Sequence, residues 1–144
     1  VHERFSEQEL VKLKTRYPQA HIIAHPECPA NLLSYAKHVG STSSLIRYAE
    51  QNAGREFIVL TEPGIFHEMK KRSPGSQFYP VPGIAEGSCI SCNNCPYMKL
   101  NSLEKIYLCM KNGKPSIEMA PELMRRAKKP LDRMLDLSKN IVRN

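Results

Sequence analysis

Three cysteines at two-residue intervals are the residues of this sequence best suited to chemistry. Cys89, Cys92 and Cys95 form a C-x-x-C-x-x-C run, and Pro96 follows the last of them, as in many loops that bind iron–sulfur clusters. Prolines and glycines precede the run, and such a loop can fold several thiolates around one centre. Because core cysteines rarely recur at this spacing, the run favours metal or cluster ligation over free or disulfide-paired thiols.

The cysteine run does not complete a standard ligand set by itself. A closed zinc site takes four ligands, commonly from two pairs, and a ferredoxin run carries a fourth cysteine before its proline. The two remaining cysteines, Cys28 and Cys109, each stand alone in the sequence. An iron held by an incomplete protein ligand set keeps an open position and can act as a Lewis acid on a substrate.

Two further segments carry polar groups suited to catalysis or binding. His25 and Glu27 follow a short apolar run, and they can transfer protons near neutral pH, although spacing alone makes ordinary strand-end roles equally good. Ser41 and Thr42 open a predicted helix, where hydroxyls and backbone N–H groups can hold a phosphate. A plain helix cap is the commoner role for such hydroxyls.

The elements that must position these residues alternate between helix and strand. We expect strands over 21–24, 57–60 and 78–81, and helices over 6–17, 31–37, 41–54 and 65–72. This alternation predicts an α/β fold with a short parallel sheet between helical layers. Ligands of such sheets bind beyond the carboxyl ends of the strands, where the sequence places His25, Glu27, Thr61 and Glu62.

The last third of the sequence changes from alternating to helical patterning. Apolar residues recur at helical spacing from Leu103 to Gly113, and again after Pro121, where Pro130 predicts a kink or two separate helices. The methionines here are expected to fill the core. We therefore expect an α/β/α domain over 1–98, with the cysteine loop at 89–95, and a C-terminal helical segment over 99–144.

Composition limits the classes of function. A chain of 144 residues is enough for one domain, its net charge is +7, and its apolar runs are too short to cross a membrane. Aromatic residues do not interleave with the basic ones, which weakens a nucleic-acid role. An odd number of cysteines concentrated in one loop indicates a reducing, cytoplasmic setting. Because the sequence begins with Val1, we expect a piece of a longer protein.

Four motifs, taken together in this order, resemble quinolinate synthase, the A protein of bacterial NAD biosynthesis. They are His25-Pro26-Glu27-Cys28, Gly40-Ser41-Thr42-Ser43, Thr61-Glu62-Pro63-Gly64 and Cys95-Pro96-Tyr97-Met98. The start, Val1-His2-Glu3-Arg4-Phe5, and the tail from Ile117 to Leu135 are also similar. The resemblance covers the whole chain, and the four motifs are specific jointly although each is weak alone.

The resemblance implies a fold, a reaction and a cofactor. The family condenses iminoaspartate, which links it to L-aspartate oxidase, with dihydroxyacetone phosphate to give quinolinate. It uses a [4Fe-4S] cluster with three cysteine ligands, one from each of three α/β/α domains around a pseudo-threefold axis. This chain resembles the last domain and the C-terminal helices. Cys95 matches one ligand; the second is expected just upstream of Val1 and the third in an earlier domain, so we expect this chain alone to be inactive.

The resemblance also implies roles for single residues. His25 and Glu27 match the pair that contacts substrate and moves protons, and His2 matches an active-site histidine. Ser41 and Thr42 match residues that bind phosphate or carboxylate. Thr61 and Glu62 match a family motif, but the resemblance assigns them no chemical role.

Two cysteines of the run are not needed as cluster ligands. Cys89 and Cys92 form their own C-x-x-C, which predicts either a reversible disulfide or two incidental thiols. Cys28 is not expected to bind iron. Two other classes remain open from the residues, a zinc-binding nucleic-acid module and an electron-transfer iron–sulfur protein, but neither explains the His25-Pro26-Glu27 motif.

Overall fold

The computed structural model of the chain describes residues 1–84 and 93–141, with side chains described as far as residue 139. The chain forms two compact units, Val1–Leu100 and Asn101–Asn144, and each is described by itself. Cys89 and Cys92 lie outside the described residues, so their predicted disulfide stays a prediction.

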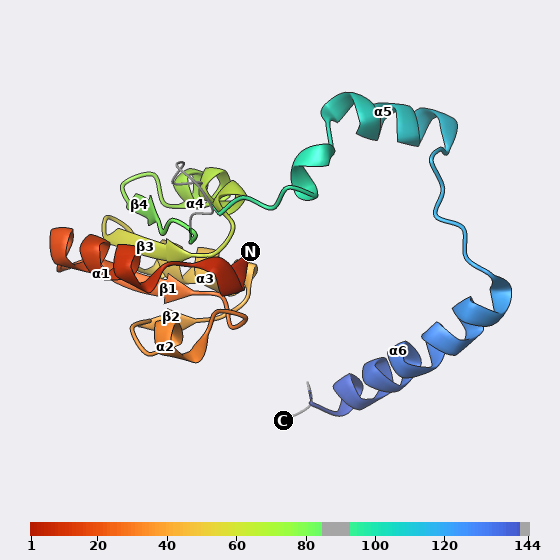
Figure 1. Cartoon of the computed structure of the whole chain (residues 1–144), viewed down its shortest axis with the longest axis horizontal. Helices are drawn as coiled ribbons and strands as arrows, with labels where there is room; N and C mark the ends of the chain where they lie inside the picture. Colours follow the sequence, from red (N-terminus) through yellow and green to blue (C-terminus); the bar gives the residue numbers. More distant parts are fainter. Residues whose placement is uncertain (85–92, 142–144) are drawn as a thin grey trace. The chain divides into compact units, whose positions relative to one another are not determined.

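The first unit alternates helices with strands along the chain (Figure 1). Its elements are η1 (His2–Arg4), α1 (Glu7–Arg16), β1 (His21–Ala24), α2 (Ala30–Leu33), β2 (His38–Val39), α3 (Thr42–Gln51), β3 (Glu56–Leu60), η2 (Pro63–Ile65), α4 (Phe66–Arg72), β4 (Gln77–Pro80) and η3 (Met98–Leu100).

The four strands found in the described residues all run parallel, in the spatial order β2-β1-β3-β4. The chain passes from β1 outward to β2, and then crosses back past β1 to form β3. The strand order therefore reverses between β1 and β3. In open parallel sheets a crevice for ligands forms at the carboxyl ends of the two strands that flank this reversal.

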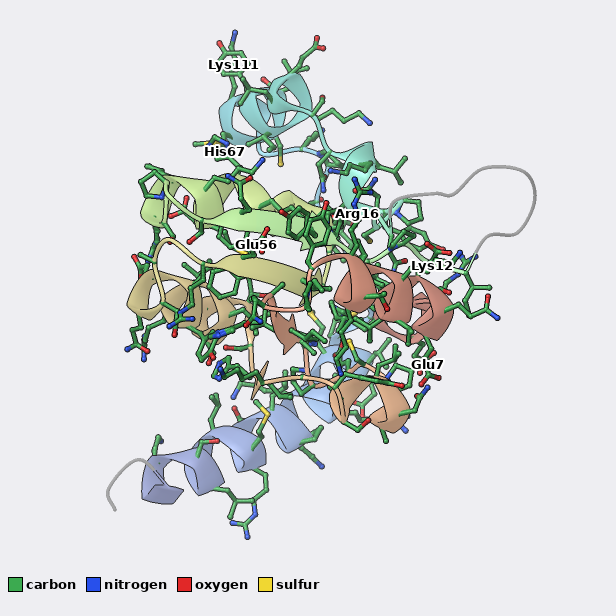
Figure 2. All side chains as sticks on the ribbon, turned by 90° about the vertical axis from the view of Figure 1, so that its left-hand side faces the viewer. Glu7, Lys12, Arg16, Glu56, His67 and Lys111 are labelled. Atoms are coloured by element: carbon green, nitrogen blue, oxygen red, sulfur yellow. The ribbon has the colours of Figure 1, made fainter. Side chains whose placement is uncertain are left out.

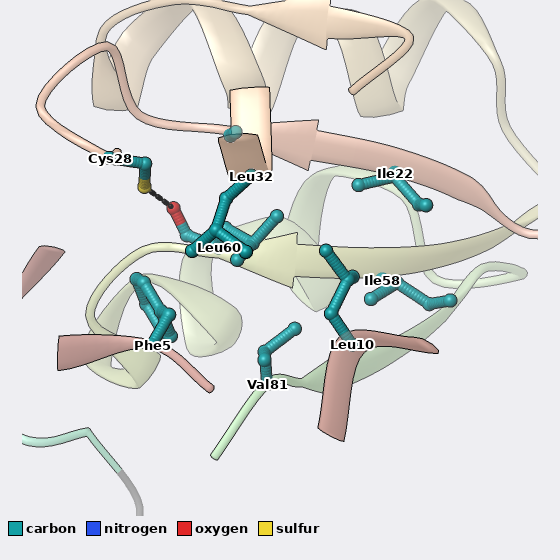
Figure 3. Close-up of a cluster of buried hydrophobic side chains, with 9 residues drawn as sticks. Phe5, Leu10, Ile22, Cys28, Leu32, Ile58, Leu60 and Val81 are labelled. Carbon is teal, nitrogen blue, oxygen red and sulfur yellow. Dashed lines mark hydrogen bonds between the residues drawn. The ribbon is translucent and has the colours of Figure 1, made fainter. Parts of the chain in front are cut away.

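Alternate side chains of the central strands fill two separate hydrophobic clusters, one on each face of the sheet. Figure 3 shows the first cluster, beneath α1 and α2: Phe5, Leu10, Ile22, Ala24, Cys28, Leu32, Ile58, Leu60 and Val81. The second lies beneath α3 and α4: Ile23, Leu45, Ile46, Ala49, Phe57, Val59, Met69 and Phe78. The predicted parallel α/β architecture, with helices on both faces of a short sheet, is therefore confirmed.

Local caps start the helices where the sequence predicts. The Ser6 hydroxyl accepts a hydrogen bond from the Glu9 amide at the start of α1, and α1 ends just before Tyr17-Pro18. Figure 2 shows the charged side chains of Glu7, Lys12 and Arg16 on the outer surface of this helix. The polar outer face and the buried Leu10 make α1 a covering helix of the sheet.

The region after α2 departs from the prediction. The helix expected over 31–37 ends at Leu33, and His38 starts the short strand β2, which the sequence did not predict. The Lys37 amide bonds the Ile22 carbonyl, and the Gly40 amide bonds the Ala24 carbonyl. A two-residue edge strand is too short to show an alternating pattern, which is why sequence periodicity misses it.

The second unit consists of α5 (Leu103–Asn112) and α6 (Pro121–Ile141). As predicted, α5 ends at Gly113, whose φ of 64° lies in the left-handed region. Of the two alternatives predicted at Pro130, a kink or two separate helices, the second is wrong, because α6 continues through Pro130. On an exposed helix, water can bind the carbonyl that a proline leaves without its partner. The side chains of Met110 and Met134 are exposed in this structure, not core fillers.

Within the described residues, none of the helices has the length and apolar character needed to traverse a lipid bilayer.

The first hydrophobic cluster should dominate the stability of the sheet unit. We expect Leu10→Ala to lower the free energy of unfolding by about 2–5 kcal/mol, because Leu10 is fully buried and truncation leaves a cavity. Its neighbour on α1, Val11, is 43% exposed, so Val11→Ala should change stability by about 0.5 kcal/mol or less. Urea unfolding of the two variants compares them directly, and equal losses would contradict the packing described.

Candidate active site

A hydrogen-bonded cluster lies at the point where the strand order reverses. His2 comes from the N-terminal turn η1, His25 and Glu27 from the loop after β1, and Thr61 from the end of β3. The His2 Nδ1 atom is 2.8 Å from Glu27 Oε2, and its Nε2 atom is 3.2 Å from Thr61 Oγ1. Three segments far apart in the sequence thus meet at one imidazole ring.

The two histidine rings lie against each other. His2 and His25 stack with their ring centres 4.2 Å apart and their planes 10° apart. Their side chains are only 18% and 19% exposed, whereas that of Glu27 is 70% exposed. The Glu27 backbone amide donates a hydrogen bond to His25 Nδ1 at 3.4 Å. The carboxylate therefore faces solvent, at the edge of a hollow of about 450 Å³ lined by Val1, His2, Glu3 and Glu27.

Backbone contacts hold the N-terminal turn in place beside these loops. The Ile84 amide donates to the Arg4 carbonyl at 2.6 Å, and the Ser6 amide donates to the Pro82 carbonyl at 3.1 Å. These bonds join the turn to the segment that leaves β4. The position of His2 is consequently set by the sheet unit and not only by its own side-chain partners.

The segment that carries Cys95 is bonded on both sides of Cys95 to residues adjacent to His2 and Thr61. The Asn93 side-chain amide donates to the Val1 carbonyl at 2.5 Å, next to His2. Farther along, the Lys99 ammonium lies 3.9 Å from Glu62 Oε1, and Glu62 directly follows Thr61. Cys95 itself is partly exposed. The structure therefore ties the cysteine segment to the same edge of the sheet as the histidines.

Glu62 has one oxygen in use and one without a hydrogen bond. Oε2 accepts from the Gly64 amide at 2.6 Å, and a Cβ atom on Gly64 would come within 2.5 Å of this oxygen, so a larger residue there would displace the Glu62 carboxylate. Oε1 is buried and has no hydrogen-bond partner among the described residues; Lys99 is its ion-pair partner. A buried oxygen of this kind can accept a bond from a ligand or another segment.

The cluster sets the protonation of two groups. The hydrogen bond from His2 lowers the pKa of the Glu27 carboxyl below its ordinary value. Burial, and then the neighbouring His2, lower the pKa of His25. At neutral pH the site therefore presents a carboxylate beside a neutral imidazole, a combination that can accept and donate protons.

The cysteines differ in their fitness as metal ligands. Cys28 is buried, its Sγ donates to the Leu60 carbonyl at 3.5 Å (Figure 3), and burial raises its pKa to about 11. Cys28 therefore remains a thiol inside the core, whereas thiolates are what bind metals. Cys109 belongs to the second unit. Among the described cysteines of the first unit, Cys95 is the one accessible to a metal centre.

A mononuclear metal site is a second possibility at the histidines. Ligand atoms of His2, His25 and Glu27 lie within 4.8 Å of one another. Both Nδ1 atoms already take part in hydrogen bonds, one toward the Glu27 carboxylate and one from the Glu27 amide. A cation bound through these two Nδ1 atoms would have to displace both bonds, so the geometry favours a proton-handling network over a metal site.

The predicted anion-binding residues lie at the same edge but remain separate from the cluster. Ser41 is the N-cap of α3, and its hydroxyl accepts from the Ser44 amide at 3.4 Å. Thr42 is the first residue of α3. The described structure gives no hydrogen bond from either hydroxyl to His25 or Glu27.

Sequence reasoning missed two of these contacts. The Thr61 hydroxyl touches His2, although the residues alone predicted only that Thr61 follows a strand. Asn93 lies inside the cysteine run, and its side-chain amide bonds the Val1 carbonyl. The strand-end position was a usable signal for Thr61, whereas nothing in the sequence indicated the bond from Asn93 to Val1.

The bond between His2 and Glu27 can be tested by titration. We expect His2→Ala to raise the pKa of Glu27 toward its ordinary value of 4.5, because the largest lowering influence is removed. Carbon NMR of the Glu27 carboxyl measures this directly. His67→Ala, which removes an exposed histidine on α4, is the matched control and should leave the pKa of Glu27 unchanged. An unaltered Glu27 titration in His2→Ala would contradict the bond described.

The same shifts fix the direction of the pH dependence of stability. Where the pKa is lower in the folded chain, the unfolded chain binds more protons, so stability falls as pH drops below the ordinary value. For His25 the loss begins near pH 6.5, and for Glu27 near pH 4.5.

Comparison with known proteins identifies relatives of this chain. The family described as "Quinolinate synthetase A protein" matches residues 1–136. A quinolinate synthase of Ehrlichia chaffeensis is 53% identical over 138 residues, which cover 96% of this chain and 44% of the relative. That of Prochlorococcus marinus is 54% identical over 137 residues, covering 95% and 40%.

A quinolinate synthase of Cyanophora paradoxa is also similar, at 47% identity over 138 residues that cover 96% of this chain and 41% of the relative. The chain therefore spans about two fifths of the length of these curated relatives. The match extends through both units and includes every segment that contributes to the histidine cluster. This chain belongs to the quinolinate synthetase A protein family.

Proposed function

We propose that the polypeptide containing this sequence condenses iminoaspartate with dihydroxyacetone phosphate to give quinolinate, for the biosynthesis of NAD. An L-aspartate oxidase would supply the iminoaspartate. The name of the relatives supports this activity. The observation that carries it is the anchoring of the Cys95 segment, at Asn93 and Lys99, to the edge of the sheet that holds His2, His25 and Glu27.

The cofactor proposed is a [4Fe-4S] cluster, with Cys95 as one ligand. A partly exposed thiol fits a centre whose other cysteine ligands come from elsewhere in the longer protein. When bound, such a cluster supplies an open iron that polarises an oxygen or imine of the substrate. Because Cys95 is the suitable thiol among the described residues, we expect the chain of 144 residues alone to be inactive.

The remaining residues bind substrate and move protons. Glu27, open to solvent and held as a carboxylate, takes a proton from the substrate as the condensation proceeds. His25, neutral and next to it, gives or takes the protons needed for loss of water. Ser41 and Thr42, at the start of α3, hold a phosphate or carboxylate on the helix amides.

The ligand role of Cys95 has a direct test in the chain extended to the length of its relatives and purified without oxygen. We expect brown protein that makes quinolinate, and loss of both properties in Cys95→Ser. Altering outer-shell partners of a metal costs about 10–100-fold in activity or metal affinity, so loss of a ligand should cost at least as much.

Cys109→Ser is the matched control, because Cys109 lies on α5 in the second unit, and it should keep colour and activity. Colourless wild-type protein, or a cluster and activity that survive Cys95→Ser, would reject the proposal.

The role of Glu27 is tested separately from the cluster. We expect Glu27→Gln to lower quinolinate formation by about 10²–10⁴-fold, the range for removal of a general acid or base, while the visible spectrum of the cluster is retained. Steady-state rates and absorbance on the same sample give both results. Glu68→Gln, which alters a partly exposed carboxylate on α4 that pairs with Arg72, is the control. Full activity in Glu27→Gln would remove Glu27 from the proton-transfer path.

A further inference from the structure

Both nitrogens of His2 are engaged, whatever its charge. A carboxylate only accepts hydrogen bonds, so the 2.8 Å contact requires a proton on His2 Nδ1, directed to Glu27. In the neutral ring Nε2 is then an acceptor, and the Thr61 hydroxyl donates to it at 3.2 Å. In the charged ring Nε2–H donates to the same hydroxyl, because a hydroxyl does both. In neither state does His2 have an N–H left for a ligand.

His25 has the opposite arrangement. The Glu27 backbone amide points its hydrogen at His25 Nδ1, and a second hydrogen cannot occupy that lone-pair direction. The proton of the neutral ring must therefore sit on Nε2. Within the described residues, Nε2 of His25 has no hydrogen-bond partner, and the ring is fixed by stacking on His2.

We propose that Glu27 and Thr61 hold His2 as a positioning residue, so that His25 alone presents an N–H, at Nε2, to an oxygen acceptor of the ligand. Thr61 thereby acquires a role: it fixes the ring of His2, and His2 in turn orients the Glu27 carboxylate and supports the face of His25. The ligand group would be a carboxylate, phosphate or carbonyl oxygen. The chemical class of this ligand group rests on the proposed function, whereas the protonation pattern of the two histidines does not.

Nitrogen NMR of the ¹⁵N-labelled chain of 144 residues measures the pattern. Protonated and unprotonated nitrogens of a neutral imidazole resonate at well-separated frequencies, and long-range proton–nitrogen correlations assign each tautomer. At a pH well above the ordinary histidine range, we expect His2 protonated on Nδ1 and His25 protonated on Nε2. Single His→Ala variants assign the signals, and His67, exposed on α4 (Figure 2), is the internal reference.

Variants of Thr61 test the positioning role. Thr61→Val keeps the size of this buried side chain but removes the hydroxyl, so the Nε2 signal of His2 should move toward that of an unbonded acceptor nitrogen. Thr61→Ser keeps the hydroxyl and should restore the wild-type frequency. The His25 tautomer should persist in both variants, because its amide partner comes from the Glu27 backbone.

Substitutions of His25 test the nitrogen offered to the ligand, in the longer protein. The Gln side-chain amide lies near the position of Nε2, and that of Asn lies near Nδ1. His25→Gln should therefore retain about tenfold more quinolinate formation than His25→Asn, the effect of one hydrogen bond of ordinary strength.

The outcomes separate the two ideas. A His25 proton on Nδ1, a His2 proton absent from Nδ1, or a His2 Nε2 signal unchanged in Thr61→Val would overturn the inference, even in an active enzyme. If Thr61→Val does not fold, the wild-type spectrum and Thr61→Ser decide. Absence of quinolinate formation in the wild-type protein would reject the proposed function. The tautomers of His2 and His25 would still be decided by the nitrogen spectrum.

Discussion

The in-register pairing of β1 with β3 is the constraint on which the site depends. Their register runs from His21 opposite Phe57 to Ala24 opposite Leu60, and the bond from the His25 amide to the Leu60 carbonyl extends it by one step. Both strands therefore end at the same level. His25 and Thr61 are the next residues of each, so a ring from η1 can contact both loops at once.

Burial on both faces keeps this register unique. Ile22 and Ile23 point into different hydrophobic clusters, as do Ile58 and Val59. A slip of one residue would send each of these side chains to the wrong face and would separate His25 from Thr61. The two cores thus do more than stabilise the sheet, because they determine which loop residues become neighbours.

Most of the first unit could be predicted from local signals, whereas much of the site could not. The Ser6 cap, the apolar runs of β1 and β3 and the Ser41 cap are short-range features that the structure keeps. β2 escaped prediction because two residues show no period. The contacts of His2 with Glu27 and Thr61 span 25 and 59 residues, and the bond from Asn93 to Val1 spans 92. Pairings of this range follow from the packed fold, and local sequence patterns do not contain them.

The stacking of the two imidazoles limits how much charge the cluster can hold. With ring centres 4.2 Å apart, two imidazolium ions would repel strongly in a site that is largely shielded from water. After burial, this repulsion from His2 is the next cause that lowers the pKa of His25. The stacked rings therefore disfavour a second positive charge at this edge of the sheet, next to a carboxylate that is open to solvent.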